Sequence, residues 1–237
     1  MNSRARNARG NKVVLVLGGA RSGKSGFAGR LAETRFRRPV YLATAEVLDA
    51  EMAGRIELHR KARGSRWQCV EEPLDIARVL RHPPETGDGI LLDCLTLWLS
   101  NVLLKEGEKA VASRKRQLLA ALQAAAVPVI LVSNEVGMGI VPEHKLGRTF
   151  RDLAGWLNQD VAAVADAVVF VVAGLPMVLK GKMDGPRESL ARQSRNPNKG
   201  NHGFPGAARW AATKESETAG VEHEGRKGSK GKAFPLR

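Results

Sequence analysis

The sequence predicts an α/β fold in which a mainly parallel central sheet is flanked by helices. Three observations support this class. Short runs rich in Val, Ile and Leu recur along the chain, these runs are apolar throughout, and stretches of helical composition separate them. Strands that are apolar on both faces must be covered on both sides, which is the usual state of a parallel sheet. The chain shows no internal repeat.

The expected strands are these continuous apolar runs. The first, VVLVL at 13–17, is rich in β-branched residues, as strands commonly are. The last, DAVVFVVAG at 166–174, closes the predicted sheet. The others are expected, in chain order, at 40–44, 67–70, 89–95 and 127–133.

Helices are expected between the strands. The clearest is amphipathic and begins at Leu146, because Phe150, Leu153 and Leu157 follow it at steps of three and four. This pattern continues to residue 164. The remaining helices are predicted at 24–34, at 50–63, at 74–80, from the end of the 89–95 strand to 104, and at 108–125.

A glycine-rich loop follows the first strand directly. It fits the pattern GxxxxGK[ST] between a strand and a helix, which is the context that this motif requires. Its backbone N–H groups would turn toward a phosphate chain, Lys24 would supply a positive charge, and the following helix would present its positive end. We therefore predict a P-loop NTPase of the RecA-like type, with Lys24 as a catalytic residue. A chance glycine-rich turn is the alternative. The predicted nucleotide-binding residues of the loop are Gly18, Gly19, Ala20, Arg21, Ser22, Gly23, Lys24 and Ser25.

Asp93 ends the apolar segment GILLD. P-loop proteins commonly place a carboxylate near Mg²⁺ at this position. We therefore expect Ser25 and Asp93 to hold a Mg²⁺ ion between them. The alternative is a strand-end aspartate that caps the next helix. A P-loop indicates a nucleoside triphosphate but does not specify the reaction.

The net charge of +14 is concentrated at the two ends of the chain. Residues 1–12 form a basic extension with four Arg or Lys and no acid, and residues 182–237 carry twelve Lys or Arg against six Asp or Glu. The remainder, 13–181, is predicted to be one catalytic domain. The 182–237 tail is rich in Gly, Pro, Ser and Asn and is predicted to be disordered, because it cannot bury enough apolar surface. It is interpreted as a solubilising extension, with a docking segment as the alternative.

Composition also bears on location and partners. Two cysteines are too few for a disulfide framework and lack metal-ligand spacing, which favours a reducing, cytoplasmic location. No apolar run reaches the roughly 18 residues of a membrane span, and no signal-peptide pattern precedes the first strand. Nucleic acid is not an expected partner, because the central part contains no recognised nucleic-acid motif. A nucleic-acid-binding NTPase that uses the basic ends is kept as an alternative.

Three segments are distinctive as a set. They are GGARSGKS (18–25), DAEMAGRIELHR (49–60) and SNEVGMGIVPEHKLGRTFRDLAGWLNQDVA (133–162). Together they resemble the bifunctional adenosylcobinamide kinase/adenosylcobinamide-phosphate guanylyltransferase family of cobalamin biosynthesis. The resemblance is collinear over 13–180 and specific, because NEVGMGIVP is long and unusual. His144 stands where the family pattern has Asn, and the tail has no counterpart in that pattern.

The resemblance implies two reactions. Adenosylcobinamide is phosphorylated on its aminopropanol hydroxyl by a nucleoside triphosphate, GTP or ATP. GMP is then transferred from GTP to that phosphate through a guanylyl-histidine, which gives adenosylcobinamide-GDP. The family histidine lies in an RIxxH setting, which here makes His59 the matching nucleophile. A neutral imidazole, with a pKa of about 6.5, is a suitable nucleophile near pH 7. A simple P-loop small-molecule kinase without covalent nucleotide is the alternative.

The resemblance also implies further nucleotide contacts and a homo-oligomer, a trimer. Cations at 60–63 can neutralise phosphates, and a carboxylate such as Glu71 can accept from a guanine N–H or a ribose hydroxyl. A solvated helix end is the alternative for the cations. Asn134 and Glu135 could contact nucleotide, metal or corrinoid, or could form a structural turn. The implied nucleotide contacts beyond the P-loop are Ala43, Thr44, Ala45, Arg60, Lys61, Ala62, Arg63, Glu71 and Asp93.

Overall fold

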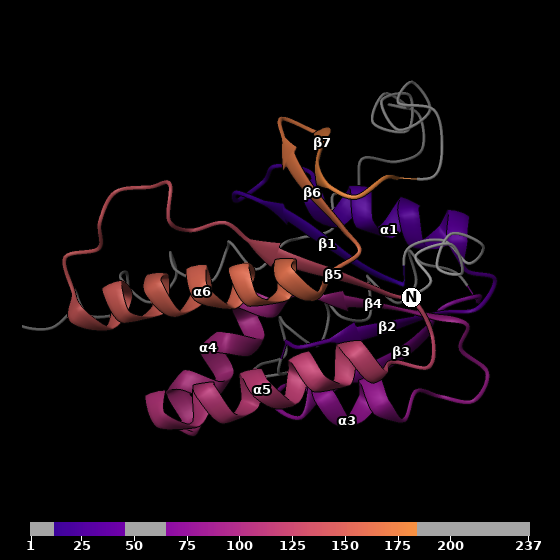
Figure 1. Cartoon of the computed structure of the whole chain (residues 1–237), viewed down its shortest axis with the longest axis horizontal. Helices are drawn as coiled ribbons and strands as arrows, with labels where there is room; N and C mark the ends of the chain where they lie inside the picture. Colours follow the sequence, from indigo (N-terminus) through magenta and orange to yellow (C-terminus); the bar gives the residue numbers. More distant parts are fainter. Residues whose placement is uncertain (1–11, 46–64, 184–237) are drawn as a thin grey trace, which may run out of the picture.

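The computed structural model describes residues 12–45 and 65–183. The helix expected at 50–63, with His59 and the 60–63 cations, lies outside the described residues, as do nearly all of the two terminal extensions. The described residues form a seven-stranded sheet of order β3-β2-β4-β5-β1-β6-β7. Every neighbouring pair is parallel except β6 and β7 (Figure 1). The predicted α/β class with a mainly parallel sheet is therefore confirmed.

Apart from β7, the described elements lie within about two residues of their predicted ends. The strands are β1 (Val13–Gly18), β2 (Pro39–Ala43), β3 (Gln68–Glu71), β4 (Gly89–Asp93), β5 (Val129–Asn134), β6 (Ala167–Val172) and β7 (Leu175–Lys180). The described helices are α1 (Lys24–Arg35), α3 (Ile76–Arg81), α4 (Leu95–Lys105), α5 (Glu108–Ala124) and α6 (Lys145–Val164).

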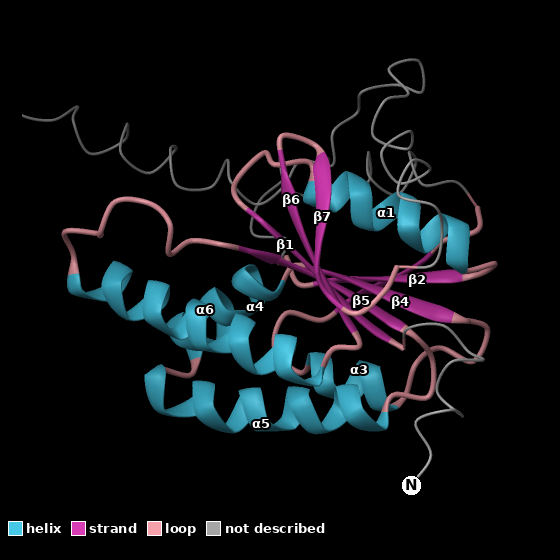
Figure 2. Cartoon of the chain, turned by 45° about the horizontal axis from the view of Figure 1, so that its top comes forward, coloured by secondary structure: helices cyan, strands magenta, loops and turns pink. Residues whose placement is uncertain are grey.

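Helices cover both faces of the sheet (Figures 1 and 2). On one face, α1 packs Phe27 and Leu31 against β1, β4, β5 and β6. On the other face lie α4 and α6, and α5 packs across α3, α4 and α6. The central strands are therefore enclosed on both sides, with Val14 and Leu15 of β1 fully buried. This double burial explains why their sequences are apolar at every position.

β7 was not predicted, because the sequence was expected to close its sheet at 166–174. The chain instead turns at Ala173 and Gly174, whose positive φ angles of 50° and 79° suit a two-residue hairpin. β7 then pairs antiparallel with β6. Its apolar side chains at Leu175, Met177 and Leu179 are all more than half exposed. The strand therefore lacks the continuous burial that identified the others.

Both cysteines of the chain are described, and both are free thiols, with Cys69 exposed and Cys94 buried. None of the described helices has the length and apolar character needed to cross a membrane.

Candidate functional site

The predicted nucleotide-binding residues that the structure describes lie along one edge of the sheet, at the carboxyl ends of the parallel strands. In register, Gly18 pairs with Asn134, Asp93 with Ala43, and Ala43 with Glu71. Ligands of open α/β sheets bind outside this edge. From β1 to β3 the edge spans four strand spacings, or about 19 Å. An extended nucleoside triphosphate can lie along such an edge.

The loop between β1 and α1 has the backbone form of a phosphate cradle. Arg21 and Gly23 adopt left-handed φ angles of 55° and 91°, which turn successive N–H groups inward. α1 begins without a side-chain cap and without an acidic residue in its first turn. Its first N–H groups thus remain available to an anion. The Gly174 N–H donates to the Ser22 carbonyl at 2.8 Å, so the β6–β7 turn supports the loop from one side.

Lys24 is buried beneath this loop, and its Nζ donates to the Gly19 carbonyl at 3.0 Å. Burial lowers the pKa of Lys24, and negative charge at Cys94 and Asp93 would oppose that shift. Burial also raises the pKa of the Cys94 thiol, which is therefore neutral at physiological pH. The Asp93 carboxylate is then the charge that opposes the effect of burial on the pKa of Lys24. The Lys24 ammonium and the Asp93 carboxylate therefore lie close enough to interact electrostatically.

Ser25 and Asp93 carry oxygen groups of the kind that Mg²⁺ takes as ligands. Ser25 is a buried hydroxyl in the first turn of α1, and Asp93 is a half-buried carboxylate at the end of β4. Mg²⁺ usually takes one or two protein carboxylates together with waters and phosphate oxygens. The described residues contain no group of three or more His, Cys, Asp or Glu that could hold a metal ion. Cys94, and not Asp93, occupies the N-cap position of α4.

Tyr41 orients Asp93 and was not singled out from the sequence. Its hydroxyl donates to Oδ2 of Asp93 at 3.2 Å. Its ring packs edge-on against Trp67, with the centroids 6.3 Å apart and the planes at 77°. The only sequence signal was a phenol within the apolar run VYLA.

Neutral polar side chains join the strand ends behind the phosphate loop, and we call Thr44, Cys94, Thr96, Asn134 and Asn158 the edge cluster. The Thr44 hydroxyl donates to the Cys94 carbonyl at 2.9 Å and accepts from the Cys94 N–H at 3.0 Å. The Asn134 amide donates to the Thr96 hydroxyl at 2.7 Å. The Asn158 amide donates to the Asn134 carbonyl at 3.0 Å. These bonds join the residues that follow β2 and β4, and they join α4 and α6 to the end of β5, at the edge that carries the predicted nucleotide residues.

The hydrogen bonds in and beside the edge cluster show how three of the predicted site residues, Thr44, Asn134 and Glu135, are placed. Thr44 is fully buried and its hydroxyl is engaged within the cluster, so this side chain lies beneath the edge. Asn134 belongs to the same cluster, and Glu135 accepts hydrogen bonds from backbone N–H groups of the loop that follows it. Both side chains thus make hydrogen bonds within the protein itself. Ala43 is buried, Ala45 is half-buried and Glu71 is exposed at the end of β3.

Residues 14–179 match the family described as "Cobinamide kinase / cobinamide phosphate guanyltransferase". The chain belongs to this family. The phosphate loop, Asp93, the edge cluster and the loop after β5 all lie within the matched residues of the cobinamide kinase/guanyltransferase family. The predicted class of enzyme, a bifunctional cobinamide kinase and guanylyltransferase, is confirmed at the level of the family.

Two relatives match over almost their whole length. The bifunctional adenosylcobalamin biosynthesis protein CobP of Pseudomonas aeruginosa is 48% identical over 168 residues, which cover 71% of this chain and 97% of that protein. The bifunctional adenosylcobalamin biosynthesis protein CobU of Escherichia coli is 40% identical over 181 residues, which cover 71% of this chain and 99% of that protein. Likeness to solved structures is weaker. The RadB recombinase, at 12% identity, overlaps with a TM-score of 0.45 over 73% of this chain and 82% of that chain.

Proposed function

We propose that this chain phosphorylates adenosylcobinamide with GTP or ATP and then transfers GMP from GTP to the product. The observation that carries the proposal is the phosphate loop with buried Lys24 beside Asp93, in a member of the cobinamide kinase/guanyltransferase family. In the first reaction the substrate hydroxyl attacks the γ-phosphorus, a nucleoside diphosphate leaves and the hydroxyl proton is released. Lys24 stabilises the charge that develops on the phosphate oxygens. Mg²⁺ held by Ser25 and Asp93 would neutralise further phosphate charge.

The second reaction is assigned to His59 from its RIxxH setting. An imidazole nitrogen attacks the α-phosphorus of GTP, and the bond to pyrophosphate breaks. A phosphate oxygen of adenosylcobinamide phosphate then attacks the same phosphorus, which restores the imidazole and gives adenosylcobinamide-GDP. Cations at 60–63 would bind phosphates, and Ala43, Ala45 and Glu71 would contact the rest of the nucleotide along the sheet edge.

Incubation with GTP labelled on the α-phosphate tests the covalent step. We expect label on the protein that is labile to acid and stable to base. His59→Ala should abolish it, whereas His82→Ala, at the end of α3, should keep it. No label on wild-type protein that phosphorylates adenosylcobinamide would reduce the proposal to a simple small-molecule kinase.

We also propose that the chain forms a homotrimer and acts in the cytoplasm, as the family resemblance implies. The exposed apolar side chains of the edge strand β7 support self-association, since such strands are usually covered. The free thiols suit a reducing compartment. Sedimentation equilibrium measures the assembly, and an active monomer would overturn the proposed trimer.

A further inference from the structure

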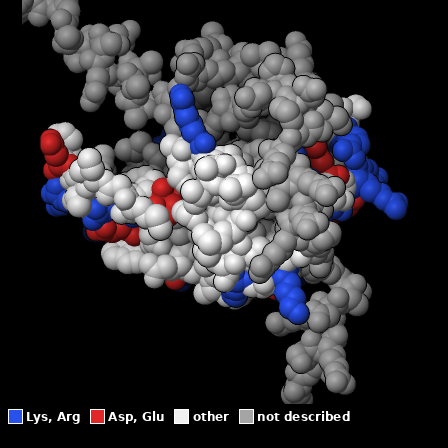
Figure 3. Space-filling view, turned by 90° about the horizontal axis from the view of Figure 1, so that it is seen from above, with Lys and Arg blue, Asp and Glu red and all other residues white. Residues whose placement is uncertain are grey.

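The segment between β5 and α6 exposes apolar side chains in water. Met138 is 80% exposed, Ile140 97% and Val141 56%. We call residues 137–141 the apolar loop. It projects from the body of the molecule together with the first turns of α6 (Figure 1). Seen from above, the segment that projects at the left is largely uncharged on its upper surface, with charged side chains toward its tip (Figure 3).

The backbone around the apolar loop is fixed by its own hydrogen bonds. On one side, the Glu135 carboxylate accepts from the N–H of Gly137 at 2.7 Å and from that of Met138 at 3.1 Å. On the other side, the Arg148 guanidinium donates to the Pro142 carbonyl at 3.1 Å. A loop that is already ordered loses less conformational entropy when it binds. Exposed apolar groups on an ordered backbone indicate a binding surface.

The apolar loop is also tied to the phosphate loop. The Glu135 N–H donates to the Gly18 carbonyl at 3.0 Å, and β1 and β5 are neighbours in the sheet. A substrate hydroxyl must reach the end of the phosphate chain that lies in the phosphate loop. The remainder of a large substrate must therefore extend over the adjoining loops of the same edge.

We infer that Met138, Ile140 and Val141 bind the corrin ring of the cobinamide substrate. This inference rests on the proposed function and extends it from the nucleotide to the second substrate. A corrin ring carries methyl groups and the methylene stems of its amide arms, which gain from apolar contacts, whereas the amide ends of the arms remain in water. The flexible thioether of Met138 is suited to the irregular surface of such a ring. The competing occupant is a second copy of the chain.

Equilibrium dialysis against adenosylcobinamide, followed by the visible absorbance of the corrinoid, tests the inference. The double variant M138S/I140S should raise the dissociation constant about tenfold or more, because it removes apolar surface that binding would bury. The matched control is Leu104→Ser, which replaces a 67% exposed leucine at the far end of α4. This control should leave the dissociation constant unchanged.

Two results would overturn the inference. One is an unchanged dissociation constant in the double variant. The other is a change in its sedimenting mass that matches the loss of binding, which would make the apolar loop a contact between copies. Labelling by GTP requires no corrinoid and is measured on the same preparations. Absent label on wild-type protein counts against the proposed function, whereas normal label with unchanged corrinoid binding counts only against this inference.

Discussion

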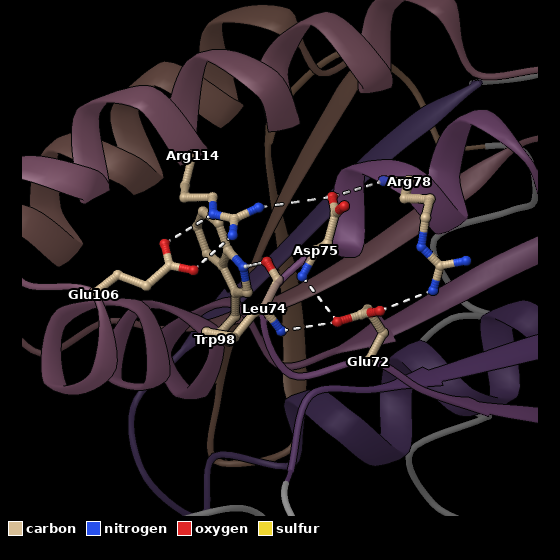
Figure 4. A network of polar contacts seen from close by, with 7 residues as sticks. All are labelled: Glu72, Leu74, Asp75, Arg78, Trp98, Glu106 and Arg114. Carbon is tan, nitrogen blue, oxygen red and sulfur yellow. Dashed lines mark hydrogen bonds and ion pairs between the residues drawn. The ribbon is translucent and has the colours of Figure 1, made fainter.

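Two polar networks of this molecule differ in charge and in burial. The edge cluster is neutral and mostly buried, with Thr44 fully buried and Thr96 only 5% exposed. The second network lies at α3, α4 and α5 and is charged (Figure 4). In it, Arg114 forms a two-pronged pair with Glu106, at 2.9 Å and 2.6 Å, and Arg78 pairs with Glu72 at 2.9 Å. We call Glu72, Asp75, Arg78, Glu106 and Arg114 the charged network.

The difference indicates what each network does. A buried donor that loses its partner has no water to replace it, so the strand ends of the edge cluster are held firmly. The charged network is partly open to solvent, where water and salt weaken each ion pair. The edge cluster, whose bonds are the harder to replace, therefore lies at the edge that carries the phosphate loop. The charged network lies away from that edge, where helices pack against one another.

The largest expected effect is the loss of activity when Lys24, in the phosphate loop at this edge, is replaced. Lys24→Met should lower the rate of adenosylcobinamide phosphorylation by about 10²- to 10³-fold, because a positioned cation is lost from the phosphate chain. Stability to urea should not fall, since a buried ammonium is replaced by an apolar group. The control is Lys109→Met on the exposed surface of α5. A Lys24→Met enzyme with the wild-type rate would remove Lys24 from the mechanism.

A smaller effect is expected within the edge cluster itself. Thr96→Val keeps the shape of the side chain but removes the acceptor of the Asn134 amide, which should cost about 2 kcal/mol of unfolding free energy. Thr34→Val is the matched control, because its hydroxyl bonds to the Arg30 carbonyl at an exposed site. Urea titration measures both. Equal losses in the two variants would mean that burial gives the edge cluster no special role.

The two halves of the candidate site differed in how far the sequence could predict them. The phosphate loop is contiguous, and Asp93 is marked by the end of an apolar run, so both were predicted. The edge cluster was not predicted as a unit, because its bonds join residues far apart in the chain. Thr44 and Cys94 are 50 positions apart, and Thr96 and Asn134 are 38 apart. A single sequence does not show which strand ends become neighbours.

The fold was predictable for a related reason. Each central strand is buried on both faces, so its apolar run identifies it without any knowledge of its partners. β7 gave no such signal, because it is an exposed edge strand that includes Pro176. Its existence depends on pairing with β6 and on the turn at Ala173 and Gly174.

The charged network should tolerate substitution better. Arg114→Gln should cost no more than about 1 kcal/mol of unfolding free energy, since exposed ion pairs contribute little. A double-mutant cycle with Glu106→Gln isolates the pair, and its coupling energy should be about 0.5–1 kcal/mol. A coupling as large as the loss in Thr96→Val would erase the contrast between the two networks.

The smallest expected effect is the change with pH in the stability that the Glu106–Arg114 pair contributes. The hydrogen bond from Arg114 lowers the pKa of Glu106 below its ordinary value of 4.5, while partial burial opposes the shift. As the pH falls, the unfolded chain takes up this proton before the folded one. The stabilisation from Glu106 is therefore complete above about pH 4.5 and is lost as the pH falls through the lowered folded-state pKa.

Urea unfolding of wild type and Glu106→Gln, from neutral pH to about pH 3, measures this loss. The difference between the two proteins should stay constant near neutral pH and shrink in acid. The difference between wild type and Thr96→Val should stay constant over the same range, because Thr96 and Asn134 carry no charge. A Glu106→Gln difference that does not change with pH would show that this pair contributes packing and not charge. The charged network would then stabilise the helices by the same neutral contacts as the edge cluster.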